Sequence, residues 1–231
     1  MRLLFEIEKD FAVPVQGETA MFPVARIFCV GRNYAAHAAE MGVEVDRDVP
    51  FYFTKPASAI VQSGARIPYP PGTENYHYEM ELVVAIGTKA FRTTVADAPN
   101  AVFGYAAGLD MTRRDLQDAA KAKRRPWDIS KGFEQSAIIA PITKKADFPD
   151  LGSQQISLSV NGTPRQSASL NDMIHSVPEV IAHLSRFYHL GPGDLIYTGT
   201  PAGVGAVVPG DEIHGQIEGL AAVDLTIGKP D

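Results

Sequence analysis

Glycine and proline divide this sequence into short segments, and the division limits the folds that the chain can adopt. Twenty glycines and seventeen prolines interrupt the 231 residues. Between them lie short apolar runs rich in β-branched and aromatic residues, which is typical of strands. The predicted strands cover residues 27–30, 51–54, 78–86, 102–109, 155–160, 194–197, 212–217 and 223–227.

Few segments carry helix signals. The predicted helices cover residues 33–41, 112–124 and 177–187, and the second begins with a near capping box formed by Thr112 and Asp115. Because strands and helices do not alternate regularly, the pattern disfavours a doubly wound α/β fold. We therefore predict an α+β, β-rich fold, mostly antiparallel, with an N-terminal extension over residues 1–24 and a main domain over residues 25–231.

Charge and cysteine content argue against several classes of protein. The formal net charge is −6, so no broad positive field attracts nucleic acid or anionic lipid. Cys29 is the only cysteine, which rules out an intrachain disulfide, and its apolar neighbours predict a buried position. The N-terminus has acids where a signal peptide needs an apolar core, and no run reaches the ~20 apolar residues that span a bilayer. We expect a soluble, cytoplasmic protein.

Acidic residues at strand positions give the strongest chemical signal. Glu79 and Glu81 are two apart, so in a strand their side chains point the same way, while the alternate apolar residues point into a core. Asp110 ends a second predicted strand. Neighbouring carboxylates repel each other unless a positive charge lies between them, and a hard divalent cation prefers such oxygen ligands. The alternative, from spacing alone, is a solvated strand face with two surface acids, and a capping or turn role for Asp110.

Candidate catalytic groups lie in two other segments. His37 and Glu40 are three apart and would share one face of a helix, where the carboxylate fixes the imidazole tautomer and raises its basicity. On spacing alone, a surface His–Glu pair is the simpler interpretation. Lys131, near a cation site, would bind a substrate carboxylate or a developing oxyanion, although most lysines are solvated surface residues.

A glycine-rich loop, Tyr197 to Gly205, follows another predicted strand. It lacks the Gly-Lys-Ser/Thr ending of a phosphate-binding loop and the spacing of a dinucleotide fingerprint, so we exclude nucleotide binding. Its backbone amides are candidates for holding a small anion.

Together these segments resemble the fumarylacetoacetate hydrolase family from about residue 25 to the C-terminus. The motifs that carry the resemblance are Gly31-Arg-Asn-Tyr-Ala-Ala-His37, Phe53-Thr-Lys55-Pro, His77-Tyr-Glu79-Met-Glu81-Leu, Gly104-Tyr-Ala-Ala-Gly-Leu-Asp110-Met-Thr-Arg-Arg-Asp115-Leu-Gln117 and Tyr197-Thr-Gly-Thr200-Pro-Ala-Gly-Val-Gly205. The resemblance implies a mixed β-sandwich roll, a Mg²⁺ or Mn²⁺ site, a homodimer and a catalytic domain over residues 25–231. It assigns metal ligation to Glu79, Glu81 and Asp110, the catalytic dyad to His37 and Glu40, and substrate-facing positions to Gln117, Lys131 and Thr200.

The implied activity is metal-dependent hydrolysis of a carbon–carbon bond in a 2,4-diketo acid, with fumarylpyruvate as the expected substrate and fumarate and pyruvate as products. His37, held by Glu40, would activate a water for attack on the distal carbonyl, and Lys131 would stabilise the pyruvate enolate. Two alternatives stay open within the family: acetylpyruvate hydrolysis, and oxaloacetate decarboxylation, which needs no water-activating base. A non-catalytic carboxylate- or metal-binding protein would need neither the dyad nor the lysine.

The polar segment 42–50 lies between the predicted helix of His37 and the strand at 51–54. Loops of this kind often act as lids over a site. Arg47 is its one cation, and arginine can bind a carboxylate with two hydrogen bonds. We therefore expect Arg47 to bind the distal carboxylate of fumarylpyruvate, the alternative being a solvated surface arginine.

Overall fold

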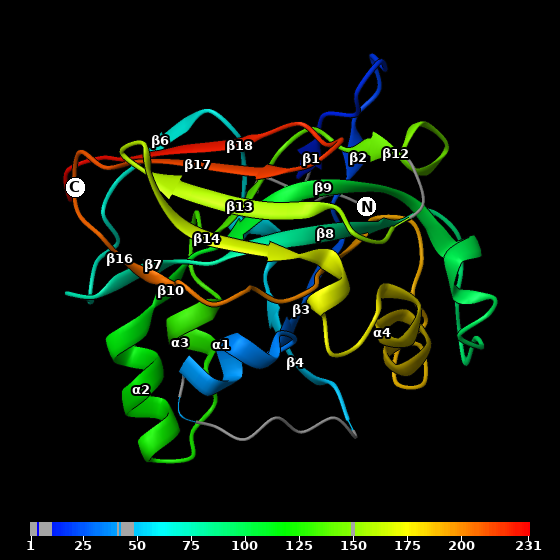
Figure 1. The fold of residues 1–231 in the computed structure, drawn as a ribbon, viewed down its shortest axis with the longest axis horizontal. Coiled ribbons are helices and arrows are strands. Elements are labelled where there is room, and N and C mark those ends of the chain that lie inside the picture. Colours follow the sequence, from blue (N-terminus) through cyan, green and yellow to red (C-terminus); the bar gives the residue numbers. More distant parts are fainter. Residues whose placement is uncertain (1–3, 5–10, 41, 43–48, 149–150) are drawn as a thin grey trace.

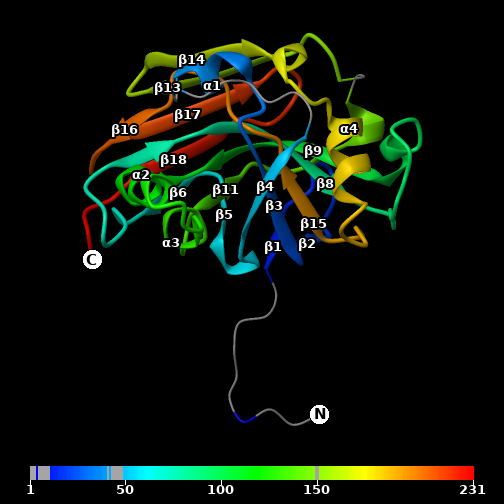
Figure 2. The same ribbon diagram turned by 90° about the horizontal axis from the view of Figure 1, so that it is seen from below.

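The structure, a computed structural model, consists mostly of two large β-sheets that lie face to face (Figures 1 and 2). The structure describes residues 4, 11–40, 42, 49–148 and 151–231. Within these residues the larger sheet has eight strands, in the order β4 (Phe51–Lys55), β3 (Arg26–Gly31), β15 (Asp194–Tyr197), β8 (Met80–Ile86), β9 (Val102–Asp110), β11 (Ala137–Ile139) and β5 (Ile60–Gln62), with β12 (Thr143–Lys144) also paired to β9.

The second large sheet and two small ones complete the β structure of the described residues. The five-stranded sheet runs in the order β14 (Thr163–Ser169), β13 (Gln155–Val160), β17 (Glu212–Ile217), β18 (Val223–Ile227) and β6 (Ala65–Ile67). The small sheets are β10 (Thr112–Arg113), β7 (Tyr76–Tyr78) and β16 (Gly205–Val207), and the ribbon of β1 (Ala12–Val13) and β2 (Phe22–Pro23). Most pairs are antiparallel, as predicted; β11–β5, β15–β3 and β18–β6 are parallel.

The main hydrophobic core fills the space between the two large sheets. Leu82 and Val84 of β8 pack there with Ile156 and Leu158 of β13 and with Ile217 of β17, and all five are buried. These residues occupy alternate positions along their strands, so the period-2 pattern of the sequence sets which face of each strand is covered.

A second core covers the opposite face of the eight-stranded sheet. Val83 of β8 lies there with Val13 of β1 and Phe22 of β2, so residues from the predicted N-terminal extension pack against the sheet. Cys29 belongs to the same core and is fully buried, as predicted. Because both faces of β8 are covered, a charged side chain on this strand must be buried, which is unfavourable unless it is paired.

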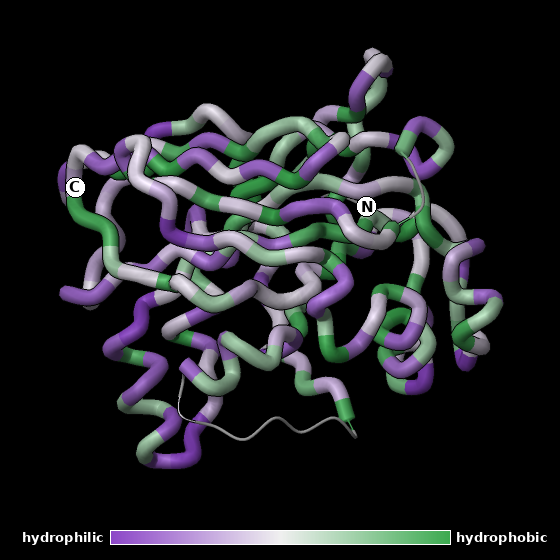
Figure 3. Tube along the Cα trace, in the orientation of Figure 1, coloured by the Kyte–Doolittle hydropathy of each residue, from purple (hydrophilic) through white to green (hydrophobic). Residues whose placement is uncertain are grey.

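Helices are short and few in the described residues. They are α1 (Ala35–Glu40), α2 (Arg114–Ala122), α3 (Asp128–Lys131) and α4 (Val177–Leu184), with 3₁₀ turns η1 (Ala57–Ala59), η2 (Ala98–Ala101), η3 (Lys145–Asp147) and η4 (Leu170–Asp172). Figures 1 and 2 show α2 and α3 side by side at one end of the molecule and α4 at the other. Figure 3 shows that α2 is largely hydrophilic, as expected for a helix at the surface. None of these helices is long and apolar enough to cross a membrane.

The β-rich α+β fold and the position of each predicted strand are confirmed. The main difference is that the run 78–86 divides into β7 and β8 at Glu79, where the chain passes from a small sheet to the large one. Asn161 and Gly162 have φ of 51° and 75° and join β13 to β14, so this Asn-Gly pair forms the turn of a β-hairpin.

The predicted start of the second helix is wrong. Thr112 lies in β10 and pairs with His77 of β7, so α2 begins at Arg114. Asp115 does not form the predicted capping box, because its carboxylate accepts hydrogen bonds from Thr73 Oγ1 (2.5 Å) and from the backbone N–H of Glu74 (2.9 Å). This tertiary contact ties the start of α2 to the turn before β7.

Candidate active site

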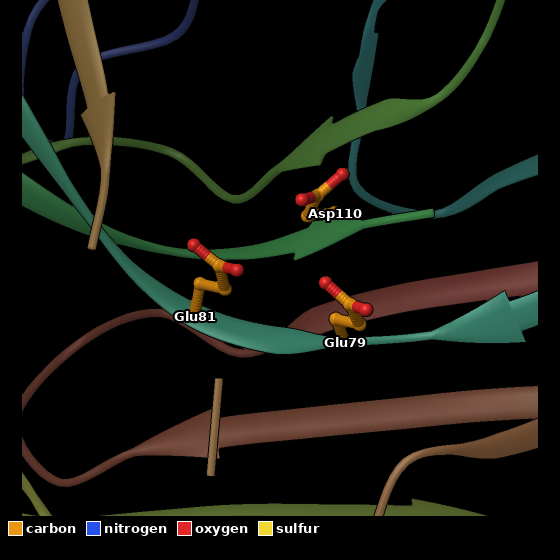
Figure 4. A group of neighbouring side chains, drawn as sticks. All are labelled: Glu79, Glu81 and Asp110. Atoms are coloured by element: carbon orange, nitrogen blue, oxygen red, sulfur yellow. The ribbon is translucent and has the colours of Figure 1, made fainter. Parts of the chain in front are cut away.

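Three carboxylates meet at the junction of β8 and β9. Glu79 lies between β7 and β8, Glu81 lies on β8, and Asp110 ends β9. Pairing of the two strands, with Asp110 N–H donating to the Glu79 carbonyl (2.9 Å), brings the three side chains together (Figure 4). One oxygen from each lies within 4.8 Å of the others, and all three residues are buried. The interpretation of Glu79 and Glu81 as solvated surface acids is therefore wrong.

Buried cations neutralise two of these carboxylates. Lys131 Nζ donates to Glu79 Oε2 (2.6 Å) and to Asp110 Oδ2 (2.7 Å), and Arg114 donates to Glu79 Oε1. Lys55 Nζ lies 2.8 Å from Asp110 Oδ1. Burial alone would raise the pKa of Glu79, but Lys131 and Arg114 more than offset it and hold that pKa well below its usual range.

Glu81 has no ion pair within the described part of the chain. Its Oε2 accepts a hydrogen bond from the backbone N–H of Gly199 (2.8 Å). Burial, followed by the charges of Asp110 and Glu79, raises the pKa of Glu81 well above its ordinary value. Asp110 Oδ1 also lacks a partner with hydrogen-bond geometry among the described residues, despite its closeness to Lys55. A buried carboxylate without a counter-ion, next to two others, fits a hard divalent cation.

The predicted dyad forms on α1. His37 Nδ1 lies 3.1 Å from Glu40 Oε2, and His37 is buried while Glu40 is exposed. Glu40 also accepts hydrogen bonds from the backbone N–H of Gly203 at 3.1 and 3.2 Å. Burial lowers the pKa of His37, although the charge of Glu79 and the hydrogen bond from His37 to Glu40 act the other way. A neutral imidazole whose Nδ1 faces a carboxylate leaves Nε2 to accept a proton.

The glycine-rich loop has a different role from the predicted one. The backbone amides of Gly199 and Gly203 donate to Glu81 and Glu40, so these two amides hold protein carboxylates instead of a small anion. Gly203 has φ of 96°, and a Cβ there would lie 2.1 Å from the Arg165 carbonyl oxygen. Only glycine fits this position. The loop can therefore lie against both the carboxylate cluster and the dyad.

The predicted substrate-facing residues line one small pocket. Gln117, Lys131 and Thr200 border it together with His37, Glu79 and Glu81. Gln117 accepts a hydrogen bond from Arg114 (2.5 Å), and Thr200 Oγ1 accepts one from Gln166 (2.9 Å). Lys131 is buried and held by two carboxylates, so the surface-lysine interpretation is wrong. Arg47 lies outside the described residues, and its predicted role stays a prediction.

Several residues of the site were not predicted from the sequence. Arg114 donates hydrogen bonds to Glu79 and Gln117 and so orients both side chains. Arg114 Nε also donates a hydrogen bond to His77 Nδ1 (3.4 Å). Gln166 reaches the site from β14, a strand that was not predicted because it is polar along most of its length. The i, i+3 spacing of Arg114 and Gln117 was a usable signal for one shared helix face. Lys55 had no comparable signal, because nothing in a short strand marks a lysine as buried.

Comparison with known proteins gives consistent similarities. The family described as "Fumarylacetoacetate (FAA) hydrolase C-terminal" matches residues 26–227. The chain is 52% identical over 190 residues to a fumarylpyruvate hydrolase from Ralstonia sp., which covers 81% of this chain and 98% of that protein. It is 41% identical over 205 residues to the mitochondrial oxaloacetate tautomerase of Homo sapiens, covering 89% of this chain and 92% of that one. The crystal structure of fumarylpyruvate hydrolase from Pseudomonas aeruginosa in complex with Mn²⁺ and pyruvate has a TM-score of 0.93 at 45% identity, covering 99% of this chain and 100% of that chain.

Proposed function

The chain belongs to the fumarylacetoacetate hydrolase family, and from this premise we propose that it hydrolyses the 2,4-diketo acid fumarylpyruvate to fumarate and pyruvate. The observation that carries the proposal is that a buried three-carboxylate cluster and the buried His37 of the His37–Glu40 dyad meet at one pocket. The likeness to fumarylpyruvate hydrolases over most of the chain supports the choice of substrate.

The site residues divide into those that hold a cation and those that hold or move protons. Glu79, Glu81 and Asp110 would hold a Mg²⁺ or Mn²⁺ ion, which when bound supplies Lewis-acid charge for the carboxylate and keto oxygens of the substrate. Lys131 is a buried ammonium. Burial by itself would lower its pKa, but the negative charges of Asp110 and Glu79 outweigh burial, so the pKa of Lys131 is raised. It therefore stays charged and stabilises negative charge that develops in the pocket.

His37 starts the reaction as a general base. In its neutral form it takes a proton from water, and Glu40 stabilises the imidazolium that results. The hydroxyl adds to the acyl carbonyl carbon of the substrate. The bond from that carbon to the neighbouring methylene carbon then breaks, and its electron pair stays on the methylene carbon as pyruvate enolate. A proton added to that carbon gives pyruvate, and the acyl part leaves as fumarate.

Product analysis tests this proposal. Purified protein with Mg²⁺ or Mn²⁺ is given fumarylpyruvate, acetylpyruvate, fumarylacetoacetate or oxaloacetate, and loss of substrate absorbance is followed. We expect the highest kcat/KM on fumarylpyruvate, with equal amounts of fumarate and pyruvate formed. No hydrolysis of any diketo acid, with metal present, would refute the proposal.

Oxaloacetate chemistry is the second candidate, favoured by the likeness to oxaloacetate tautomerases at about the 40% identity level. Decarboxylation needs no attacking water, and keto–enol tautomerisation moves only a proton, so neither yields a second carboxylic acid. The dyad held between α1 and the glycine-rich loop favours hydrolysis over decarboxylation, whereas a general base serves hydrolysis and tautomerisation alike. Carbon dioxide release, or enol conversion without bond cleavage, would identify the alternative reactions in the same assay.

We also propose that the protein acts as a homodimer in the cytoplasm. Support for a dimer comes from large apolar side chains that are exposed near one another around α4, with Val95 (50% exposed) and Phe187 (64% exposed) bordering one surface pocket. A cytoplasmic location suits the single buried thiol of Cys29. Light scattering after size-exclusion chromatography tests the first statement, and cell fractionation tests the second.

A further inference from the structure

A groove continues from the active-site pocket toward the C-terminal end of α2. Pocket and groove share five lining residues, which form the junction between them: Arg32, Phe53, Lys121, Trp127 and Lys131. A molecule with one end in the pocket can therefore extend into the groove past Phe53 and Trp127.

Positive charge dominates the lining of this groove. Arg32, Lys121, Arg124 and Arg125 line it, and Asp128 is the single acid among the described lining residues. The protein as a whole carries a net charge of −6, so this concentration of cations is local. Like charges that share a groove repel each other, and a bound anion would relieve that repulsion.

Arg32 is held in an unusual backbone conformation at the junction. It follows the end of β3 with φ of 59°, a left-handed conformation that glycine adopts with less strain. Its side chain is half-buried and makes no hydrogen bond or ion pair with any residue that the structure describes. Among the described residues nothing neutralises this guanidinium, so it is available to an anion at the junction.

Lys121 is the second cation of the junction. Its Nζ lies 5.5 Å from the centre of the Trp127 ring and 3.4 Å from the carboxylate of Asp118, which is largely exposed. Burial and then Arg114 lower the pKa of Lys121, with a further contribution from Arg32. Unlike Lys131, which is bound by two buried carboxylates, Lys121 has no buried counter-ion among the described residues.

We propose that Arg32 and Lys121 form a subsite for the second carboxylate of a dianionic diketo acid, and that Phe53 and Trp127 border the path of its unsaturated chain. The inference rests on the proposed function, because it places the keto-acid end of the substrate at the carboxylate cluster. The far carboxylate of the fumaryl group then extends to the junction, where a guanidinium and an ammonium can both donate to it. Arg32 is thereby a specificity-determining residue, distinct from the groups that carry out bond cleavage.

Paired substrates test the subsite. Arg32→Asn removes the charge while keeping a residue that tolerates a left-handed backbone, and Lys121→Gln removes the other charge. We expect each variant to lower kcat/KM for fumarylpyruvate by roughly 10- to 100-fold, mainly through KM, as for loss of a hydrogen bond between charged groups. For acetylpyruvate, which has no second carboxylate, the change should stay within about threefold. Lys123→Gln, an exposed neighbour that lines neither pocket nor groove, is the charge-matched control and should behave as wild type.

The outcomes separate this inference from the proposed function. Equal losses on both substrates, or none on either, would overturn the subsite, and so would a selective loss for Arg47→Ala without one for Arg32→Asn. If the wild-type protein hydrolyses neither substrate, the proposed function fails. The subsite is then judged by calorimetric titration with fumarate alone: weaker binding in Arg32→Asn than in Lys123→Gln supports it, and equal or absent binding overturns it.

Discussion

Neighbouring charges give two chemically identical, buried residues different ionisation in this protein. Glu79 and Glu81 are two residues apart, yet Lys131 and Arg114 keep the pKa of Glu79 low against burial, while burial and neighbouring carboxylates raise the pKa of Glu81. Burial also keeps His37 neutral near pH 7 by lowering its pKa. The site therefore contains Glu79 as a carboxylate anion, Glu81 as a carboxyl group that favours its neutral form until a cation is present, and His37 as a neutral base.

The base can be tested apart from the metal cluster. His37→Ala should lower kcat for fumarylpyruvate hydrolysis by roughly 10²–10⁴-fold, the usual contribution of a general base. Affinity for Mn²⁺, measured by calorimetry, should hardly change, because His37 is not among the clustered ligand atoms. Hydrolysis at nearly the wild-type rate would contradict the general-base role and would make the dyad a structural feature.

His77 gives a prediction about stability and pH. Burial, followed by Arg114, lowers its pKa to about 4, whereas an unfolded chain has a histidine pKa of about 6.5. Between these values the unfolded chain binds more protons, so the free energy of unfolding decreases as the pH falls from about 6.5 to about 4. His77→Gln removes this contribution, and urea unfolding at pH 7 and pH 5 should show a smaller loss of stability than in wild type. An unchanged difference between the two pH values would contradict the assignment.

At the level of elements, β14 connects the two layers beneath the active site. The Gln166 side chain accepts a hydrogen bond from the backbone N–H of Met80 (3.0 Å), the residue between the two glutamates of the cluster. It donates to Thr200 Oγ1 (2.9 Å) and to the Pro201 carbonyl (2.7 Å) in the glycine-rich loop. One buried side chain thus fixes β8 and the loop relative to each other.

Gln166→Leu should loosen this connection. The backbone groups of Met80 and Pro201 would each lose the partner that Gln166 provides, at about 1–3 kcal/mol for each buried group left unsatisfied. We expect a lower unfolding midpoint and a lower kcat, since the loop also holds Glu40 and Glu81. Ser167→Ala, at the next, exposed position of the same strand, is the control and should be close to wild type by both thermal unfolding and kinetics.

For the whole molecule, a cation at the cluster would join segments that are far apart in the sequence. Glu81 on β8, Glu79 before it and Asp110 on β9 are buried between the cores. A ligand that binds only the folded state stabilises it by about 2.7 kcal/mol at 100 times its Kd. Chelator-treated protein should therefore lose activity and unfold at a lower temperature, and Mg²⁺ or Mn²⁺ should restore both.

Glu81→Gln is the matched variant for the metal prediction. Because the raised pKa of Glu81 favours its neutral form without a cation, glutamine resembles that form and the metal-free protein should fold normally. Addition of Mn²⁺ should then leave its unfolding temperature unchanged and should not produce activity. Full activity in metal-free wild-type protein, or an equal thermal shift in the variant, would show that the cluster is not the metal site.

Local signals in the sequence were enough to predict eight of the strands and the class of fold, whereas the roles of the cluster and the dyad were assigned from the resemblance to a family. Alternation placed Glu79 and Glu81 on one side of a strand, and the i, i+3 spacing placed His37 beside Glu40. Tertiary structure alone decided which groups neutralise the cluster, because Lys55, Arg114 and Lys131 reach it from separate elements whose burial no local pattern encodes. It also moved the start of α2, where pairing of Thr112 with His77 outweighs a capping preference of about 1 kcal/mol. The basic junction of Arg32 and Lys121 likewise exists only once β3 and α2 lie beside one pocket.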